Sequence, residues 1–281
     1  MPYNYAHALT GFHALKNCKN LDVVGLPLHE DAFFLGTMGP DPYYGDAYLP
    51  PLIGGARTDL ADRLHALDGR ALFSQLLALS EGSAVRTAYT MGMLCHFLLD
   101  NRVHPYIEAR FSGKTHTPAE IAMDLPLVSY FGETRLSVPP RAFYAPSHET
   151  VRAADELHAK LFSALFSLDT RGVYARSLHK WLRLNTFSFD PHGRKRRTLC
   201  LLPQLTRFLV TDRPQDACDR LNLTHTPWRA PDGTIRTESV PELFAAAMQE
   251  CTALIDLALG GDTANVAAAL KGRNADASAV V

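Results

Sequence analysis

The segment CHFLLDNRVHPY places one carboxylate between two histidines at regular spacing. His96, Asp100 and His104 follow one another at intervals of four residues, so on an α-helix their side chains form one slowly drifting stripe. An imidazole and a carboxylate one turn apart can bind one metal ion, and the carboxylate can also bridge two ions. Taken alone, His96 and Asp100 could equally form a polar pair in the core, with His104 at an exposed helix end.

A second histidine–carboxylate pair follows shortly after the first. His116 and Glu120 are again four residues apart, near the start of the next predicted helix. Glu120 alone is more typical of a cap or a surface position, but two such pairs in tandem favour metal binding. Upstream, GPDPYY holds Asp41 in a turn between prolines, which presents a carboxylate with little entropy to lose. His65 and His7 are single histidines on predicted helices, and each alone is more typical of a core or surface residue.

The elements that carry these residues are predicted to be helical. Apolar spacing and capping signals predict helices over residues 3–17, 58–80, 83–103, 118–127, 148–168, 171–186 and 240–259. The 83–103 helix is apolar nearly all round, which is typical of a helix buried in a bundle. We expect it to stop near His104 because Pro105 cannot continue the backbone hydrogen bonding. Gly69 is a candidate break in the 58–80 helix.

No segment shows sustained period-two alternation or a hairpin signal. Residues 21–56 are rich in Gly and Pro and are predicted to be an irregular connection. The sequence therefore predicts an all-α, single-domain multi-helix bundle over residues 1–259. Residues 260–281 contain few bulky side chains and are predicted to form a flexible C-terminal tail.

Composition restricts the classes of function. The 281 residues are 47% hydrophobic and carry a formal net charge of −1, so no global field attracts nucleic acid or an anionic membrane surface. We expect no stable nucleic-acid binding. The five cysteines are widely spaced and contain no C-x-x-C pair, which argues against a disulfide framework or a thiolate zinc site. The chain shows neither a signal peptide nor a transmembrane segment, and a cytoplasmic location is expected.

These motifs, in this order, resemble those of the zinc-dependent phospholipase C family. MPYNYAHALTG resembles the family's N-terminal helix, LGTMGPDPYY its G-P-D turn, AYTMGMLCHFLLDNRVHPYIE its central H-x-x-x-D helix, and THTPAE its final H-x-x-x-E pair. The resemblance is strong over roughly residues 1–125 and weaker in NLTHTPWRAPD and SVPELFAAAM. It implies the helical fold that this family shares with the single-strand-specific zinc nucleases.

The resemblance also implies a set of metal ligands. They are His7, Asp41, His65, His96, Asp100, His104, His116 and Glu120. By analogy, Asp41, His65, His96 and Asp100 surround one ion, Asp100 bridges to a second held by His7, and the remaining three residues hold a third. Nitrogen and oxygen ligands without thiolate suit Zn²⁺, two or three ions in all, although manganese or iron could also occupy them. His13, close to His7, is a rival ligand.

The function implied is that of a zinc-dependent hydrolase of phosphoric ester bonds. Paired metal ions lower the pKa of a bridging water and hold phosphate oxygens between them, and Asp41 could orient or deprotonate the water as a catalytic residue. The expected substrate is a phosphodiester, with a phospholipid as the leading case. One alternative is a zinc-dependent nuclease or small-molecule phosphodiesterase, for which Tyr43, Tyr44, Tyr48 and the basic GRKRR segment (193–197) would serve. Tyrosines that pack a loop and a solvated basic loop are the simpler interpretation of these residues. The other alternative is a non-catalytic, metal-stabilised helical domain.

Overall fold

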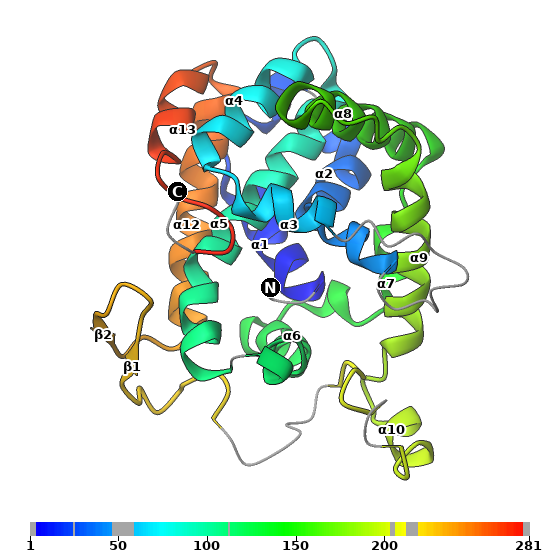
Figure 1. The fold of residues 1–281 in the computed structure, drawn as a ribbon, viewed down its shortest axis with the longest axis vertical. Coiled ribbons are helices and arrows are strands. Elements are labelled where there is room, and N and C mark those ends of the chain that lie inside the picture. The colour runs from blue at the N-terminus through cyan, green and yellow to red at the C-terminus, as the bar shows by residue number, and fades with distance from the viewer. Residues whose placement is uncertain are drawn as a thin grey trace.

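The computed structural model (Figure 1) describes residues 4–24, 26–46, 59–111, 113–202, 206–211 and 219–277. Its α-helices are α1 (Asn4–Asn17), α2 (Glu30–Thr37), α3 (Asp59–Ala66), α4 (Gly69–Ser80), α5 (Ala84–Arg110), α6 (His116–Phe131), α7 (Pro140–Tyr144), α8 (His148–Phe166), α9 (Val173–Ser188), α10 (Arg194–Thr198), α12 (Val240–Leu259) and α13 (Thr263–Ala269). Short 3-10 turns are η1 (Leu21–Val24), η2 (Leu26–His29), η3 (Asp41–Asp46), η4 (Gly113–Thr115) and η5 (Thr134–Leu136). The predicted all-α fold is confirmed.

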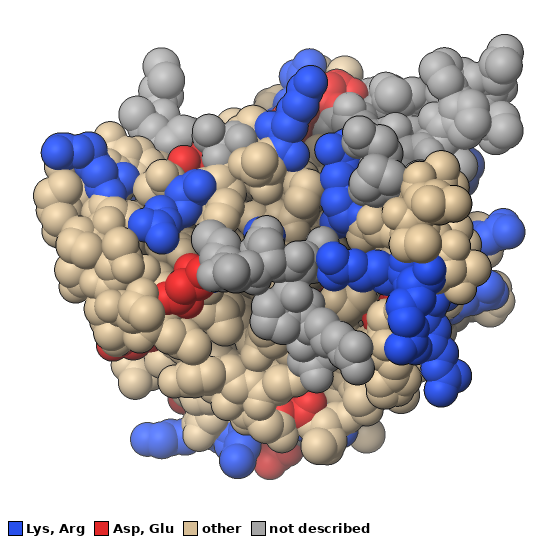
Figure 2. Space-filling view, turned by 90° about the horizontal axis from the view of Figure 1, so that it is seen from below, with Lys and Arg blue, Asp and Glu red and all other residues tan. Residues whose placement is uncertain are grey.

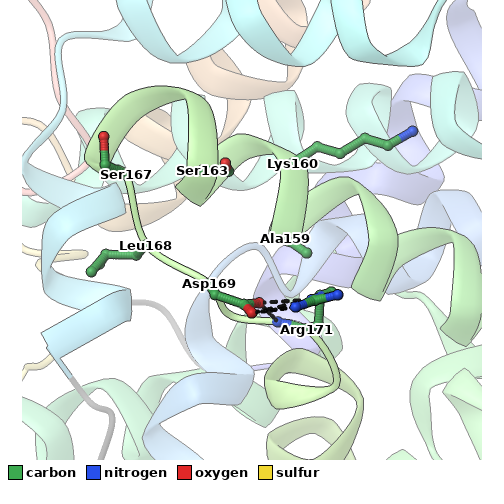
Figure 3. A pocket seen from close by; sticks show the side chains of 7 residues that line it. All are labelled: Ala159, Lys160, Ser163, Ser167, Leu168, Asp169 and Arg171. Carbon is green, nitrogen blue, oxygen red and sulfur yellow. Dashed lines mark hydrogen bonds and ion pairs between the residues drawn. The ribbon is translucent and has the colours of Figure 1, made fainter.

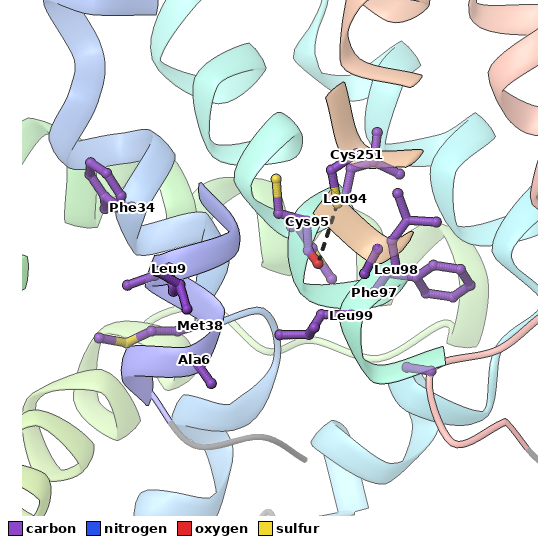
Figure 4. Close-up of a cluster of buried hydrophobic side chains, with 14 of the residues drawn as sticks. Ala6, Leu9, Phe34, Met38, Leu94, Cys95, Phe97, Leu98, Leu99 and Cys251 are labelled. Atoms are coloured by element: carbon purple, nitrogen blue, oxygen red, sulfur yellow. Dashed lines mark hydrogen bonds between the residues drawn. The ribbon is translucent and has the colours of Figure 1, made fainter. Parts of the chain in front are cut away.

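Helix α5 runs through the middle of the bundle, with α1, α2, α4, α6, α8 and α12 packed against it (Figure 1). Ser83 caps its first turn by accepting a hydrogen bond from the Arg86 amide. Figure 4 shows apolar side chains of α5, among them Leu94 and Leu98, beside neighbours from α1, α2 and α12. The burial that the sequence predicts for this helix is thus confirmed, and any polar group on it must find a partner inside the bundle.

The prediction that this helix stops near His104 is wrong. Helix α5 continues through Pro105 to Arg110. Proline removes one backbone hydrogen bond and strains the preceding turn. Burial of Val103, Tyr106 and Ile107 on both sides of Pro105 offsets that penalty, because each side chain gains free energy on leaving water. The extra turn also keeps residues after Pro105 on the same helix as the predicted ligands.

The expectation of an irregular connection over residues 21–56 overlooked α2. This helix packs along α5, and two glycines set how closely the two backbones approach. A Cβ on Gly36 would lie 2.0 Å from the carbonyl oxygen of Tyr89, and one on Gly92 would lie 1.9 Å from that of Phe33. Only glycine fits at either position. The contact places the end of α2, and hence the turn that follows it, directly beside α5.

The remaining predicted helices are close to those observed. α3 and α4 separate at the Gly69 break, where Asp68 caps α4 by accepting hydrogen bonds from the Arg70 and Ala71 amides. α12 begins at a capping box formed by Ser239 and Glu242. A small hairpin was not predicted. Its strands β1 (Trp228–Arg229) and β2 (Ile235–Arg236) pair antiparallel, and they are too short for period-two alternation to show.

The expectation of a flexible tail from residue 260 does not agree with the part of it that the structure describes. Asp262 caps α13, which packs on α4. Val266 and Leu270 are buried, and the Ala275 amide donates to the carbonyl of His65. Few bulky side chains suffice here because small residues let α13 pack closely on α4 and α12. Among the described residues, no helix combines the length and apolar character that crossing a bilayer requires.

The close approach of α2 and α5 generates a stability prediction. We expect Gly36→Ala to lower the free energy of unfolding by about 1–3 kcal/mol, because the added methyl group must force two backbones apart. Urea unfolding followed by circular dichroism measures the change. Ser74→Ala, on the exposed side of α4, is the control and should change the free energy by less than about 0.5 kcal/mol. Equal stability of Gly36→Ala and wild type would show that the helices can separate without loss.

Candidate metal centre

The first group of candidate ligands joins α1 to α5 around the carboxylate of Asp100. His7 Nε2 lies 3.3 Å from Asp100 Oδ1, and His96 Nε2 lies 3.1 Å from Asp100 Oδ2. The two imidazole rings stack with their centroids 4.2 Å apart. All three side chains are buried, and one ligand atom from each lies within 4.8 Å of the others. They are close enough to share one metal ion.

The second group adds Asp41 and His65 to His96. His65 Nε2 lies 3.4 Å from Asp41 Oδ1 and 3.2 Å from His96 Nε2. It also lies 3.8 Å from Asp100 Oδ2. Asp100 therefore faces His7 with one oxygen, and His96 and His65 with the other. A carboxylate in this position can bridge two ions, as the spacing on α5 suggests.

The turn that presents Asp41 is built against the ring of His96. Gly39 adopts a φ of +53°, a left-handed conformation that side chains rarely tolerate. A Cβ on Gly39 would also lie 2.4 Å from Cδ2 of His96. Both conditions require glycine. The Gly39 backbone therefore packs directly against the imidazole of His96. Asp41 follows at the start of η3, with its carboxylate facing His65 and His96.

The third group lies further along α5 and joins it to α6. Glu120 Oε1 is 2.8 Å from His116 Nε2 and 3.7 Å from His104 Nε2. The sequence reasoning missed Glu108, whose carboxylate lies 2.7 Å from His116 Nδ1. Glu108 follows His104 by four residues, the same spacing as the other pairs. The expected end of the helix at Pro105 concealed this signal.

The outer ring nitrogens of several of these histidines face acceptors. His96 Nδ1 lies 3.2 Å from the carbonyl oxygen of Thr37, and His104 Nδ1 lies 2.7 Å from that of Ala275. Donation of Nδ1–H to these carbonyls would leave Nε2 as the inward lone pair, the arrangement common in metal-binding histidines. His65 is approached on its outer side by the Tyr44 hydroxyl, which donates to Asp62.

Burial and mutual charge shift the titration of these groups. Burial alone would lower the pKa of His96, but the carboxylates of Asp100 and Asp41 raise it. Burial likewise opposes ionisation of Asp100, yet His96 and His7 hold its pKa well below the usual range. Burial lowers the pKa of His7 and, more strongly, that of His104. These shifts favour a charged Asp100 carboxylate and neutral imidazoles at His7 and His104. These are the protonation states that bind metal.

The donor atoms of this site fit zinc. Both oxygens of Asp100, Oδ1 of Asp41 and both ring nitrogens of His7 make no hydrogen bond to any residue that the structure describes. Buried polar atoms without such bonds are costly, and a cation would satisfy them. Nitrogen and oxygen donors at this density suit Zn²⁺. The three groups bring together all eight residues implied by the family resemblance.

His13 and the loop that contains Trp228 lie outside the three groups of candidate ligands. His13 is half-buried on α1 and belongs to none of the three groups found among the described residues. Trp228 is buried against Tyr106, with ring centroids 5.4 Å apart, and its Nε1 donates to the carbonyl of Glu238. The contact with Tyr106 anchors this loop to α5. His225, in the same loop, is exposed, and its Nδ1 lies 3.5 Å from Glu242 Oε2.

A buried histidine of α8 supports the turn that carries Asp41. His158 of α8 is buried between two hydroxyls, with Tyr43 3.1 Å from Nδ1 and Tyr89 2.8 Å from Nε2. Burial lowers the pKa of His158 to about 3, so the ring stays neutral. Tyr43 lies two residues after Asp41. The pair therefore fixes η3 to α8 and α5 by hydrogen bonds that a neutral imidazole can satisfy on both sides.

The hollow beside α8 in Figure 3 is separate from the metal groups. It has a volume of about 540 Å³ and none of the candidate ligands lines it. Its charged pair, Asp169 with Arg171, is exposed and close in the chain. Solvent screens such a pair, so it contributes little to binding or chemistry in this hollow.

The first turn of α1, which carries His7, is clamped from three sides. Asp124 of α6 accepts hydrogen bonds from the amides of Ala6 (2.7 Å) and Tyr5 (3.3 Å). Trp181 Nε1 donates to the Asn4 side chain, and the Tyr144 hydroxyl donates to the Asn4 carbonyl. A buried carboxylate at a helix N-terminus satisfies free amides and matches the helix dipole. His7 is thereby held against Asp100.

The comparisons with known proteins gave one match. The family model for zinc-dependent phospholipase C matches residues 5–180 of the chain, which include every residue of the three groups. No curated protein and no solved structure matches the chain.

The clamp on α1 generates a prediction on pH. Burial raises the pKa of Asp124 to about 7 although two amides donate to it. The unfolded chain loses this proton near pH 4, and the folded protein holds it to about pH 7. Stability therefore falls as pH rises between these values, by up to about 1.4 kcal/mol per pH unit from this group. In Asp124→Asn this slope should be absent. Urea unfolding of both proteins at pH 5, 6 and 7 measures it, and parallel curves would contradict the raised pKa.

The unsatisfied atoms of Asp100 generate a second prediction. Because a metal ion would bind only the folded site, zinc at about 100 times its dissociation constant should stabilise the wild type by about 2.7 kcal/mol over chelated protein. In Asp100→Asn the difference should be much smaller. Thermal unfolding with excess zinc and with chelator measures both differences. A zinc effect of the same size in the two proteins would show that Asp100 binds no ion.

Proposed function

The chain belongs to the zinc-dependent phospholipase C family, and from this premise we propose that it hydrolyses phosphodiesters at the centre described above. The observation that carries the proposal is Asp100. Its carboxylate is fully buried, both oxygens lack hydrogen bonds to the described residues, and histidines from three other positions converge on it. A purely structural polar core would satisfy those oxygens with donors.

We assign the ligands to three ions. His7 and Asp100 would hold the first, and Asp41, His65 and His96 the second, with Asp100 between them. The third would lie between α5 and α6 on His104, His116 and Glu120. Zinc ions in such a site lower the pKa of water toward neutrality and neutralise negative charge on a phosphate.

The protein's own groups supply positioning and proton transfer. The carboxylate of Asp41 stands at the edge of the centre on a rigid turn, with Oδ1 free of hydrogen bonds to described residues. We propose that it orients the attacking water and accepts its proton. The third group is the most open, because the His116 side chain is 22% exposed whereas those of His7 and Asp100 are inaccessible. Substrate phosphate would approach from this side.

A phospholipid or small phosphodiester fits the surroundings better than a single-stranded nucleic acid. Nuclease activity needs exposed aromatic faces on which bases can stack. Tyr43 is fully buried against His158, and Tyr44 is hydrogen-bonded to Asp62, so both are used inside the fold. Tyr48 lies outside the described residues. We therefore propose a phospholipase C-type reaction, in which the bond between phosphate and the glycerol oxygen is broken.

The activity prediction has a matched control. We expect zinc-loaded wild type to hydrolyse phosphatidylcholine and a soluble nitrophenyl phosphodiester, with both rates lost on chelation and recovered with zinc. Asp41→Asn should lower kcat/KM at least about 100-fold, the usual scale for a general base. Asp169→Asn, which makes the same change in the hollow of Figure 3, should leave it unchanged.

Metal content separates the alternatives. Plasma mass spectrometry should find two to three zinc ions per chain in wild type and at least one fewer in Asp100→Ala. Bound zinc without turnover of either substrate would support a metal-stabilised scaffold instead. Hydrolysis of single-stranded DNA in preference to lipid would support the nuclease alternative. Less than one ion per chain after zinc is added would end the hydrolase proposal.

A further inference from the structure

A basic and apolar surface lies at the end of the molecule where α10 is found (Figure 1). Helix α10 and the residues after it read RKRRTLCLL. We define the α10 patch as the side chains of Phe187, Arg194, Arg196, Arg197, Leu201 and Leu202. Seen from below, lysine and arginine side chains gather on the same side of the molecule as α10 (Figure 2). The net charge of the whole chain is only −1, so this concentration is local.

The backbone of the α10 patch is held in place by hydrogen bonds to the end of α9. Lys195 Nζ donates to the carbonyl oxygens of Phe187 and Phe189, and the Arg196 amide donates to Asp190 Oδ2. These bonds tie α10 to the end of α9. The guanidinium groups of Arg194 and Arg197, by contrast, form no ion pair with any acidic residue that the structure describes. Unpaired arginines on a fixed backbone are available to an anionic partner.

The apolar members of the α10 patch point to the kind of partner. Leu201 is 89% exposed, Phe187 63% and Leu202 50%, and these three are among the nine exposed large apolar side chains of the described residues. Adjacent exposed leucines mark a binding surface. Basic side chains beside exposed aliphatic ones suit an anionic bilayer, where the charges meet headgroups and the leucines enter the acyl boundary.

A neighbouring cavity favours lipid over nucleic acid. It lies between α6 and residues 189–192, has a volume of about 580 Å³ and is lined in part by Leu125, Val128, Phe189 and Pro191. This apolar part of the wall suits a hydrocarbon chain, and Ser129, Glu133 and His192 are among the residues that line the rest. Leucines also provide no face for base stacking, and Phe187 has the ammonium of Lys195 only 5.3 Å from its ring centroid.

We propose that the α10 patch docks the protein on anionic phospholipid surfaces. Arg194, Arg196 and Arg197 meet the headgroups, and Leu201 and Leu202 insert at the acyl boundary. Helix α6, which carries His116 and Glu120, lies at the same end of the molecule as α10 (Figure 1). Docking there would bring the open side of the metal centre toward the membrane. This last step rests on the proposed function, whereas docking itself does not.

The test is vesicle co-sedimentation of the full chain. Wild type should bind vesicles of phosphatidylcholine with 30% phosphatidylserine (about one lipid in three) far better than pure phosphatidylcholine, and raising salt to about 0.5 M should weaken binding. The variant R194Q/R196Q/R197Q should bind about 100-fold more weakly, since each basic side chain near an anionic surface contributes about fivefold. L201S/L202S should lose at least about tenfold.

A charge-matched control lies at the opposite end of the molecule. R70Q/R152Q/K160Q removes three exposed basic residues from α4 and α8 and should bind vesicles like wild type. Circular dichroism and hydrolysis of the soluble diester should be unchanged in all three variants, which shows that they fold. Equal loss in the control, or wild-type binding in both patch variants, overturns the proposal.

The remaining outcomes separate docking from catalysis. Docking by a protein that hydrolyses neither ester leaves the membrane surface standing and removes the proposed function. Hydrolysis of the soluble diester by a wild type that binds no vesicles does the reverse. Binding of single-stranded RNA that is lost in both patch variants, with no vesicle binding, would overturn the proposal and assign the α10 patch to nucleic acid.

Discussion

Burial of one carboxylate governs the rest of this molecule. Asp100 lies on a helix surrounded by the core, and an unpaired charge there costs several kcal/mol. Imidazoles from α1, α3 and α5 itself surround the Asp100 carboxylate. Those imidazoles then crowd one another, as the short His65–His96 contact shows. A divalent cation would resolve both problems, because it would neutralise the carboxylate and bind the nitrogen lone pairs that face one another.

Convergence on Asp100 requires backbones that approach unusually closely. Gly36 and Gly92 bring α2 onto α5 at backbone contact, and Gly39 then lays the turn on the ring of His96. The Thr37 carbonyl lies 3.2 Å from Nδ1 of the same ring. One short stretch, residues 36–41, thus sets the packing of two helices, the orientation of a histidine and the position of Asp41. This coupling explains why the site needs a rigid turn and not a free loop.

The sequence predicts the stripe of His96, Asp100 and His104 on one helix face, but not the contacts around it. The spacing of His96, Asp100 and His104 depends only on the local period of a helix, which sequence states directly. Glu108 was missed because the propensity of Pro105 to end helices was overridden by burial on both sides of it. Helix α2 was missed because Gly and Pro dominate its flanks. Its own first turn carries Glu30 and Asp31, which are helix-start signals. Contacts such as Asp124 with the amides of α1 join residues far apart in the chain, and no local pattern reveals them.

The spacing of residues along α5 also separates the two closed groups of candidate ligands from the open third group. Four residues on a helix rise about 6 Å, so His104 lies one turn beyond Asp100, and Glu108 one turn beyond that. The first two groups share Asp100 and His96 and are closed to solvent. The third contains the partly exposed His116, whose two ring nitrogens face Glu108 and Glu120. A closed pair beside an open third position would give firm metal binding at one end and substrate access at the other. Because each of the three groups has a member on α5, the passage of this helix through Pro105 holds the open group in register with the closed pair.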